Sequence, residues 1–203
     1  MEYQIVPITE ETVDEAAGLL AGAFHDQPVF ESILPDGADR AACLLPLFAA
    51  DVRNAIRYGG AIGIDAGLDH LLGVAYWTLK PEPERSPRED AELGFTAVFN
   101  RWGEQLAPLG EAEARALVCF ADLPRPWRYL AGIGVHPDHQ GEGHGSRLMN
   151  ILNEEARAEG QPFALVTDRE VNLPFYERAG FRIVAHEAET SMGVPFWSML
   201  LEG

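Results

Sequence analysis

One segment of the sequence constrains the fold more than any other. Between residues 129 and 159, an apolar run, a glycine-rich loop and an amphipathic pattern follow one another. Residues 129–135 are apolar at both alternating positions, as in a strand within a sheet that is covered on both faces. From about Gly145 to Glu159 apolar residues recur at helical spacing, and Gly160 can end that helix. A buried strand leading into such a helix indicates an α/β fold.

The rest of the chain predicts one domain, residues 1–203, with one hydrophobic core. Strands are expected at residues 3–8, 61–65, 71–79, 163–167, 181–185 and 196–201. Helices are expected near residues 9–24, at about 38–58 and from Asn172 to Gly180. A proline-rich loop, 81–87, leads into a helical insertion at about 84–124, in which residues 89–102 and 110–120 carry a weaker helical pattern.

Composition and charge restrict the partners. Fifteen basic residues against thirty-two acidic ones give a net charge of −17, which argues against nucleic acid or an anionic membrane. The N-terminus lacks a basic segment followed by an apolar run, so a cytoplasmic protein is expected. Cys43 and Cys119 lie in apolar runs and are predicted as buried free thiols. His136 and His139 flank Pro137 without a third ligand in the sequence nearby, so no metal site is predicted.

The loop between the predicted strand and helix suits an anion. Glycines at positions 141, 143 and 145 let the backbone approach a ligand, and the following helix offers unpaired N–H groups and its positive dipole end. Residues 128–149 carry two arginines and two acids, so this segment is neutral within an acidic chain. The glycine spacing differs from the dinucleotide fingerprint, and no lysine precedes Ser146 as a phosphate-binding P-loop requires. A tight turn without a ligand is the alternative reading.

Two motifs give the sequence a family resemblance. Gln140-x-x-Gly143-x-Gly145, after a V-x-P strand end, resembles the acetyl-CoA-binding motif of the GNAT N-acetyltransferase superfamily. Downstream, Asn172-Leu-Pro-Phe-Tyr176 is similar to the N-x-x-x-Y element of that family, before a closing Gly-Phe strand. Within the superfamily the motifs look most like the puromycin N-acetyltransferase group. The resemblance implies the GNAT fold, a mixed, splayed β-sheet flanked by helices on both faces, with acetyl-CoA as cosubstrate in the split.

The resemblance also implies roles for individual residues. Main-chain amides of Val135 and of loop 140–145 would hold the pantetheine and pyrophosphate, and Asn172 would bond the pantetheine arm. Tyr176, one turn after Asn172 on the same helix face, would be the catalytic residue facing the thioester sulfur. The alternative is that Asn172 only caps the helix and Tyr176 is a core aromatic. The full set of predicted cofactor-binding residues is Ile133, Val135, Gln140, Gly141, Gly143, His144, Gly145, Ser146 and Asn172.

Direct acetyl transfer to a small primary amine is the predicted reaction. The amine must lose a proton, yet strand 129–135 carries no carboxylate. The remaining candidates for the proton acceptor are Asp122, Glu92, His186 or ordered water. The missing carboxylate mildly favours an acceptor amine with a pKa near 7 to 8, because such an amine loses its proton more readily. Secondary candidates are arginines and histidines near the cofactor phosphates, and aromatic residues lining an acceptor cleft: Arg147, Arg178, His139 and His144 for the phosphates, and Phe30, Trp77, Trp127, Tyr129 and Trp197 for the cleft.

Two alternatives share the same motifs. One is an acetyltransferase whose acceptor is a protein or peptide, for which an open groove is expected in place of an enclosed aromatic cleft. The other is an acyl-CoA-binding sensor without catalysis. The expected partner is a small-molecule amine, without nucleic acid or membrane, and the sequence leaves the oligomeric state, including a homodimer, open.

Overall fold

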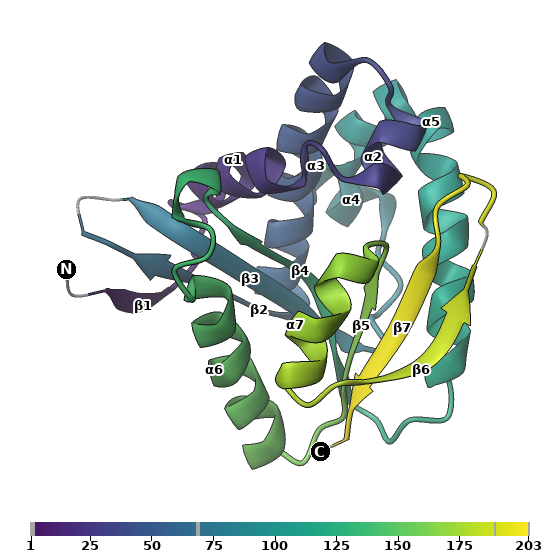
Figure 1. The fold of residues 1–203 in the computed structure, drawn as a ribbon. Coiled ribbons are helices and arrows are strands. Elements are labelled where there is room, and N and C mark those ends of the chain that lie inside the picture. The colour runs from purple at the N-terminus through teal and green to yellow at the C-terminus, as the bar shows by residue number, and fades with distance from the viewer. Residues whose placement is uncertain (1–2, 68–69, 189, 203) are drawn as a thin grey trace.

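The computed structural model describes residues 3–67, 70–188 and 190–202 and contains a sheet of seven strands in the order β1-β2-β3-β4-β5-β7-β6 (Figure 1). Neighbouring strands are antiparallel except β4 and β5, which are parallel, so the sheet is mixed as predicted. The strands are β1 (Gln4–Pro7), β2 (Gly59–Asp65), β3 (Leu71–Lys80), β4 (Trp127–Val135), β5 (Phe163–Thr167), β6 (Arg182–Glu187) and β7 (Phe196–Leu201).

The sheet splits between β4 and β5. These strands pair only where Arg128–Leu130 faces Phe163–Leu165. A bulge shifts the register of β4 against β3, since Tyr76 lies opposite Gly132 whereas Trp77 lies opposite Leu130. A bulge bends its strand, and β4 and β5 diverge beyond this point (Figure 1). The second half of β4 therefore has a free edge facing β5.

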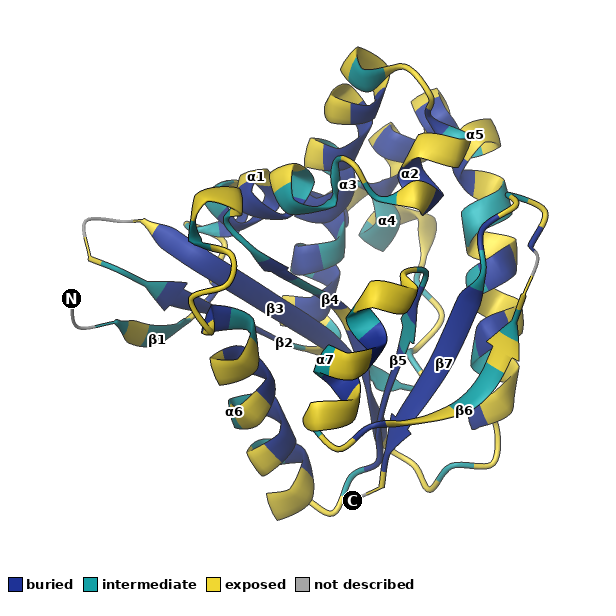
Figure 2. Cartoon of the chain, viewed as in Figure 1, coloured by how far each residue is buried: buried dark blue, intermediate teal, exposed yellow. Residues whose placement is uncertain are grey.

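Helices cover both faces of this sheet, which confirms the predicted α/β class. On one face, α1 (Val13–Phe24), α2 (Pro28–Ile33), α3 (Gly37–Tyr58) and α5 (Phe95–Ala116) build the larger apolar cluster. On the other, α6 (His144–Ala158) and α7 (Leu173–Arg178) pack on a second cluster. Figure 2 shows α6 with its buried side toward the sheet and its exposed side outward.

Helix starts follow local capping chemistry. The Asp36 side chain accepts hydrogen bonds from the N–H groups of Ala38 and Asp39, at 2.9 and 3.0 Å, and so begins α3. Ser86 and Glu89 form a reciprocal capping box at the start of α4 (Pro87–Leu93). These starts are encoded locally, and α3 lies close to where the periodicity places it, whereas the helix predicted at 89–102 is divided at Gly94 between α4 and the following helix.

The segment between β3 and β4 differs from the prediction. Two helices were expected at 89–102 and 110–120, but α5 is one helix of 22 residues that continues through Gly103 and Pro108, followed by a short 3-10 helix, η1 (Leu117–Phe120). Tertiary packing overrides the weak helix propensity of glycine and proline here. The apolar face of α5 packs against the larger cluster along its whole length, through Val98, Trp102, Leu106, Ala112 and Ala116.

Three smaller expectations also need correction. The short helix α2 was not predicted, because Pro28 was read as a chain break although proline suits the first turn of a helix. Strand β4 begins at Trp127, two residues before the predicted start. Cys43 is buried as expected, but Cys119 is exposed on η1. Among the described residues, no helix combines the length and apolar character that a membrane span requires.

Candidate active site

The loop between β4 and α6 has the geometry of an anion cradle. Gly141 and Gly143 have positive φ angles of 84° and 88°, which other residues adopt only with strain. Gly143 is the N-cap of α6 and provides no side chain to bond the first-turn N–H groups. The Gln140 amide closes the loop by donating a 3.3 Å hydrogen bond to the Val135 carbonyl. Free amides and the helix dipole therefore converge on one side of the loop.

A cavity of about 500 Å³ adjoins this loop, and we call it the cradle cavity. All nine predicted cofactor-binding residues line it, together with Tyr176. The structure thus brings together residues from β4, the loop, α6 and the start of α7. What they bind stays a prediction. The nine are Ile133, Val135, Gln140, Gly141, Gly143, His144, Gly145, Ser146 and Asn172.

Charged residues around the cradle cavity only partly match the prediction. Arg178 lines the cavity, whereas Arg147 is exposed and does not. Arg169, which was not predicted, also lines it. No motif in the sequence identifies Arg169 as a cavity residue, because Arg169 lies at the cavity only through the approach of the end of β5 to the loop between β4 and α6. Two arginines thus supply positive charge beside a cradle of neutral amides.

The loop histidines have a shared carboxylate partner. His144 is buried, and its Nε2 lies 3.3 Å from Glu142 Oε2, while His139 Nδ1 lies 3.4 Å from the same oxygen. The three ligand atoms lie within 4.8 Å of one another. The expectation that no third potential ligand lies near His139 is therefore wrong, although His136 is not part of this group. Only His144 lines the cradle cavity, so His139 is not placed beside a phosphate there.

Asn172 and Tyr176 both line the cradle cavity. Asn172 precedes α7, and its side chain makes no capping hydrogen bond to the helix. Capping therefore does not account for this residue. Tyr176 is 8% exposed, packs in the α6–α7 cluster and also lines the cradle cavity. Burial, and secondarily the Asp168 charge, raises the pKa of Tyr176, so its hydroxyl remains protonated at neutral pH and can donate a hydrogen bond.

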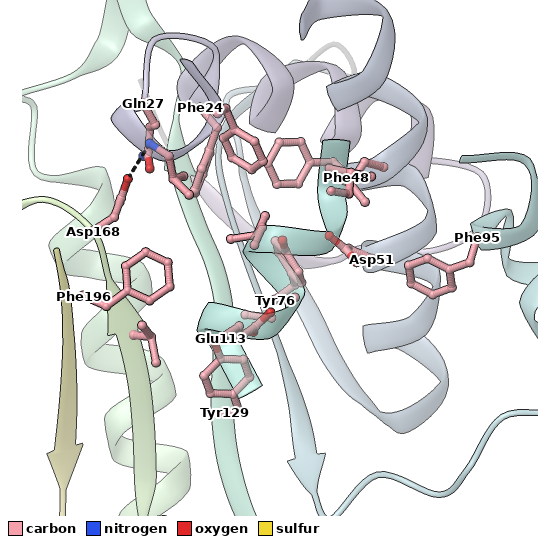
Figure 3. Close-up of a pocket in the computed structure, with 18 of the residues that line it drawn as sticks. Phe24, Gln27, Phe48, Asp51, Tyr76, Phe95, Glu113, Tyr129, Asp168 and Phe196 are labelled. Atoms are coloured by element: carbon pink, nitrogen blue, oxygen red, sulfur yellow. Dashed lines mark hydrogen bonds between the residues drawn. The ribbon is translucent and has the colours of Figure 1, made fainter. Parts of the chain in front are cut away.

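A second cavity, of about 290 Å³, lies on the other side of the split, and we call it the acceptor cavity (Figure 3). Its wall is aromatic and apolar, but it contains three carboxylates, Asp51, Glu113 and Asp168. Figure 3 shows Asp168 beside Gln27 and Phe24 on one side, and the other two carboxylates on the opposite side. The aromatic residues of the wall are Phe24, Phe30, Phe48, Tyr76, Phe95, Phe99, Tyr129 and Phe196.

Sequence reasoning identified only part of this wall. Phe30 and Tyr129 line the cavity as expected, but Trp77, Trp127 and Trp197 do not. Trp77 packs in the opposite cluster, under the guanidinium of Arg128, and Trp197 stacks on His186 with ring centroids 4.8 Å apart. Trp127 packs in a separate cluster at the end of the sheet. Which face of a strand points to a cavity depends on register and bulges, which composition does not reveal.

The proton acceptors expected from the sequence do not lie at either cavity. Glu92, Asp122 and His186 are exposed, and none of them lines either cavity. The carboxylates come instead from the residue after β5, Asp168, and from helices α3 and α5. A signal for Asp51 was present in the sequence, because a carboxylate interrupts the apolar helical stripe of Phe48, Val52 and Ala55.

The two cavities meet at the split in the sheet. A small cavity of about 70 Å³ connects them, and Phe24 and Gln27 line all three. This junction shares Asp168 with the acceptor cavity and shares Asn172 and Tyr176 with the cradle cavity. A group that reaches through the junction from either side therefore meets both a carboxylate and a protonated phenol.

Two of these carboxyl groups, Asp168 and Asp51, have pKa values above that of an aspartate in water. Burial raises the pKa of Asp168, although its Oδ2 accepts a 3.2 Å hydrogen bond from the Val29 N–H, which partly offsets the rise. Burial, and secondarily the Glu113 charge, raises the pKa of Asp51 to about 7, although Arg85 partly offsets the rise. Carboxyl groups shifted in this direction can accept a proton near neutral pH.

Comparisons with known proteins agree with this geometry. The family model of the acetyltransferase (GNAT) domain matches residues 89–183. Glucosamine 6-phosphate N-acetyltransferase from Trypanosoma brucei brucei is 36% identical over 61 residues, or 30% of this chain and 40% of that protein. The match thus spans well under half of the length of that curated relative.

Solved structures resemble the whole chain. One from Corynebacterium glutamicum, described as histone acetyltransferase HPA2 and related acetyltransferase, has a TM-score of 0.66 at 21% identity and covers 98% of this chain and 96% of its own. The Drosophila melanogaster polyamine N-acetyltransferase has a TM-score of 0.62 at 16% identity, over 100% of both chains. The fold is therefore the GNAT acetyltransferase fold. The family match includes β4, the cradle loop and α7, and with the named relative it supports the transferase class.

Proposed function

We propose that this chain is an acetyl-CoA-dependent N-acetyltransferase that acts on the primary amine of a small molecule. The observation that carries the proposal is the junction, where a cavity beside an anion cradle meets a carboxylate-containing cavity, next to Tyr176 and Asp168. An anionic cofactor with a long neutral arm fits the first cavity, and a cationic acceptor fits the second.

Acetyl-CoA fits the cradle on its chemistry. The free amides at the start of α6 and the guanidinium groups of Arg169 and Arg178 would bind its phosphates. The exposed edge of β4 at Ile133 and Val135 and the uncapped Asn172 side chain would bond the amides of the pantetheine arm. Bound in this way, the cosubstrate would have its thioester near Tyr176, which lines the same cavity.

Two residues of the chain, Asp168 and Tyr176, would then take part in the reaction. When bound, acetyl-CoA supplies the acyl carbon, to which the amine nitrogen bonds as the carbon–sulfur bond breaks, so that a thiolate leaves and one amine proton is released. Asp168 would accept a different proton, the one that the ammonium form of the acceptor loses before attack, directly or through water, while the proton released on attack passes to the thiolate or to water. Since an ordinary alkylamine with a pKa near 10.4 is almost fully protonated at pH 7, such an acceptor is needed before attack.

Tyr176 would act as a hydrogen-bond donor to the thiolate. Its raised pKa makes full proton transfer less favourable, whereas a hydrogen bond in a buried site still stabilises the developing negative charge. A covalent acetyl-enzyme is not part of the proposal. Cys43 is buried with a pKa raised to about 11 by burial, and neither it nor Cys119 lines the junction.

The acceptor cavity supports a small molecule over a protein. Its volume of about 290 Å³ is at the lower end of ordinary ligand pockets, and its wall is aromatic. A solved structure with the same fold is a polyamine N-acetyltransferase, in agreement with a small amine. The motif similarity to the puromycin N-acetyltransferase group adds antibiotic-like amines to the candidate acceptors, and a protein or peptide acceptor remains the alternative.

Two measurements test the proposal. Acetyl-CoA at millimolar concentration should raise the melting temperature, because a ligand that binds only the folded state stabilises it. A thiol-release assay should then detect turnover with at least one member of a panel of aminonucleosides, aminoglycosides, polyamines, amino acids and peptides. No thermal shift overturns the cofactor assignment. A shift without turnover on the whole panel favours an acyl-CoA sensor.

A further inference from the structure

The acceptor cavity has two separate acidic ends. Asp168 lies at the junction, where the reacting amine must be, so it is engaged in the proposed function. Asp51 from α3 and Glu113 from α5 lie on the opposite side of the cavity, beside Tyr76 and Tyr129 (Figure 3). Phenylalanine side chains also line this cavity. The second acidic end has no role in acetyl transfer as proposed above.

These two carboxylates have no cationic partner within the described part of the chain. Neither Asp51 nor Glu113 forms an ion pair there. Arg85 is the cation that acts on Asp51, but its guanidinium bonds Asp90 at 2.8 Å and Asn54 at 3.2 Å, and it lies over the Phe95 ring. The acidic end therefore has carboxylates without an ion-paired counterion among the described residues, and such groups are costly in an apolar cavity.

A tyrosine hydroxyl adds a second, independent observation. Tyr76 is 2% exposed and lines the acceptor cavity, and the hydrogen bonds found among the described residues include none from its hydroxyl. Tyr129, by contrast, donates to Glu113 Oε1 at 2.7 Å. This oxygen is not among the fully buried polar atoms that lack a partner, so it is open to the cavity that Tyr76 lines. A ligand group that reaches this end would meet an available hydroxyl and two carboxylates.

The charge state of this end responds to a cation. Burial and the neighbouring Glu113 charge raise the pKa of Asp51 to about 7, so without a ligand Asp51 is partly protonated at neutral pH. A cation placed beside it would favour the ionised form. The other ionisable groups that act on Asp51 or lie beside it are Glu82, Arg85, Tyr76 and Tyr129.

We propose that Asp51, Glu113 and the Tyr76 hydroxyl form a second cation subsite, which selects acceptors that carry two positively charged groups separated by an apolar body. This inference rests on the proposed function, because the first amine is the one acetylated at the junction. The second group is bound and not modified. The phenylalanine wall contacts the body between them, so an alkyl chain or an aromatic ring can fill the space.

Matched acceptor pairs test the subsite. Each diamine from 1,3-diaminopropane to 1,8-diaminooctane is compared with the unbranched monoamine of equal carbon number, and 1,4-bis(aminomethyl)benzene is compared with 4-methylbenzylamine. For at least one pair, kcat/KM should favour the diamine 10-fold or more, equivalent to about 1.4 kcal/mol. Differences of twofold or less for every pair overturn the inference.

Single substitutions test whether Asp51 and Glu113 cause the preference for diamines. Asp51→Asn and Glu113→Gln should each reduce the diamine-to-monoamine ratio at least fivefold, whereas Glu104→Gln, an exposed acid on the same helix as Glu113, should leave it unchanged. A ratio that survives in both cavity variants overturns the assignment. Asp51→Glu, which retains the charge, should keep part of the preference.

A binding measurement separates this inference from the proposed function. Thermal shift with the best-fitting diamine, with and without acetyl-CoA, requires no turnover. If no amine is acetylated but the diamine stabilises wild type and not Asp51→Asn, the subsite stands and the proposed function fails. If amines are acetylated but diamines have no advantage in binding or turnover, the subsite fails alone.

Discussion

Replacement of Tyr176 by phenylalanine isolates one hydroxyl at the junction. The ring packs among Phe175 and Phe181, with centroids 5.0 and 6.2 Å away, and phenylalanine can retain those contacts. The hydrogen bonds found among the described residues include none from this hydroxyl. The free energy of unfolding should therefore change by less than about 1 kcal/mol. The variant removes a donor while keeping the fold.

The expected loss of activity follows from burial of this residue. Loss of one preorganised donor to a developing negative charge typically reduces kcat by about 10²–10³. A thiolate accepts hydrogen bonds more weakly than an oxyanion, so we expect at least a 10-fold fall in kcat for Tyr176→Phe, or about 1.4 kcal/mol or more. Acetyl-CoA affinity should change little, because the interaction strengthens only as the thiolate forms.

The assay combines thiol release at saturating acetyl-CoA, calorimetric binding of acetyl-CoA and a melting curve. Tyr58→Phe is the matched control, since that hydroxyl donates a 2.9 Å hydrogen bond to Glu89 and lines neither the cradle nor the acceptor cavity. The control should keep full activity. An unchanged kcat in Tyr176→Phe would refute the role of this hydroxyl. A loss of acetyl-CoA binding that equals the loss of activity would instead indicate a structural role.

Three further results are expected. Asp168→Asn should lower kcat at least 10-fold and remove the ascending limb of the kcat/KM–pH profile. In wild type this limb should lie above the pH range of an ordinary aspartate, because burial raises the pKa of Asp168. A limb that persists in the variant argues against Asp168 as the base. Gly143→Ala should weaken acetyl-CoA binding, because Gly143 has φ 88°. Gly18→Ala is the control, since Gly18 is exposed on α1, lines neither cavity and has open space around an added Cβ, so it should bind acetyl-CoA normally; equal affinities of the two variants measured by calorimetry contradict this. The pKa of Asp51 is raised from 3.8 to about 7, so ionisation of Asp51 destabilises the folded state as the pH rises through that interval. The melting temperature of Asp51→Asn relative to wild type should therefore increase from pH 5 to pH 8. A constant difference would show that Asp51 does not titrate in this range.

Several elements could be predicted because their signals are local. The apolar run before the cradle, the periodic pattern of α6 and the glycine spacing lie within 31 consecutive residues, 129–159. Strand, loop and helix adjacent in sequence must be adjacent in space. All nine predicted cofactor-binding residues and Tyr176 therefore line the cradle cavity, whereas Phe24, Gln27 and Arg169, which come from other segments, were not predicted.

The acceptor cavity could not be predicted in the same way. Its residues come from α1, α2, α3, β3, α5, β4, β5 and β7, and from segments next to them. Asp51 and Glu113 are 62 positions apart, and nothing in the sequence near either residue indicates the other. The continuous course of α5, which positions Glu113, contradicts the local signals of Gly103 and Pro108.

The sequence alone thus determined the α/β class, the cradle and the position of Tyr176, because each depends on local periodicity or on a short motif. Only the tertiary structure decided which carboxylates reach the junction and which aromatic residues form the acceptor wall. Those depend on the bulge that bends β4 away from β5 and on helix packing across the sheet. The physical reason is that cavities lie where long-range packing leaves space, and packing is a property of the whole chain.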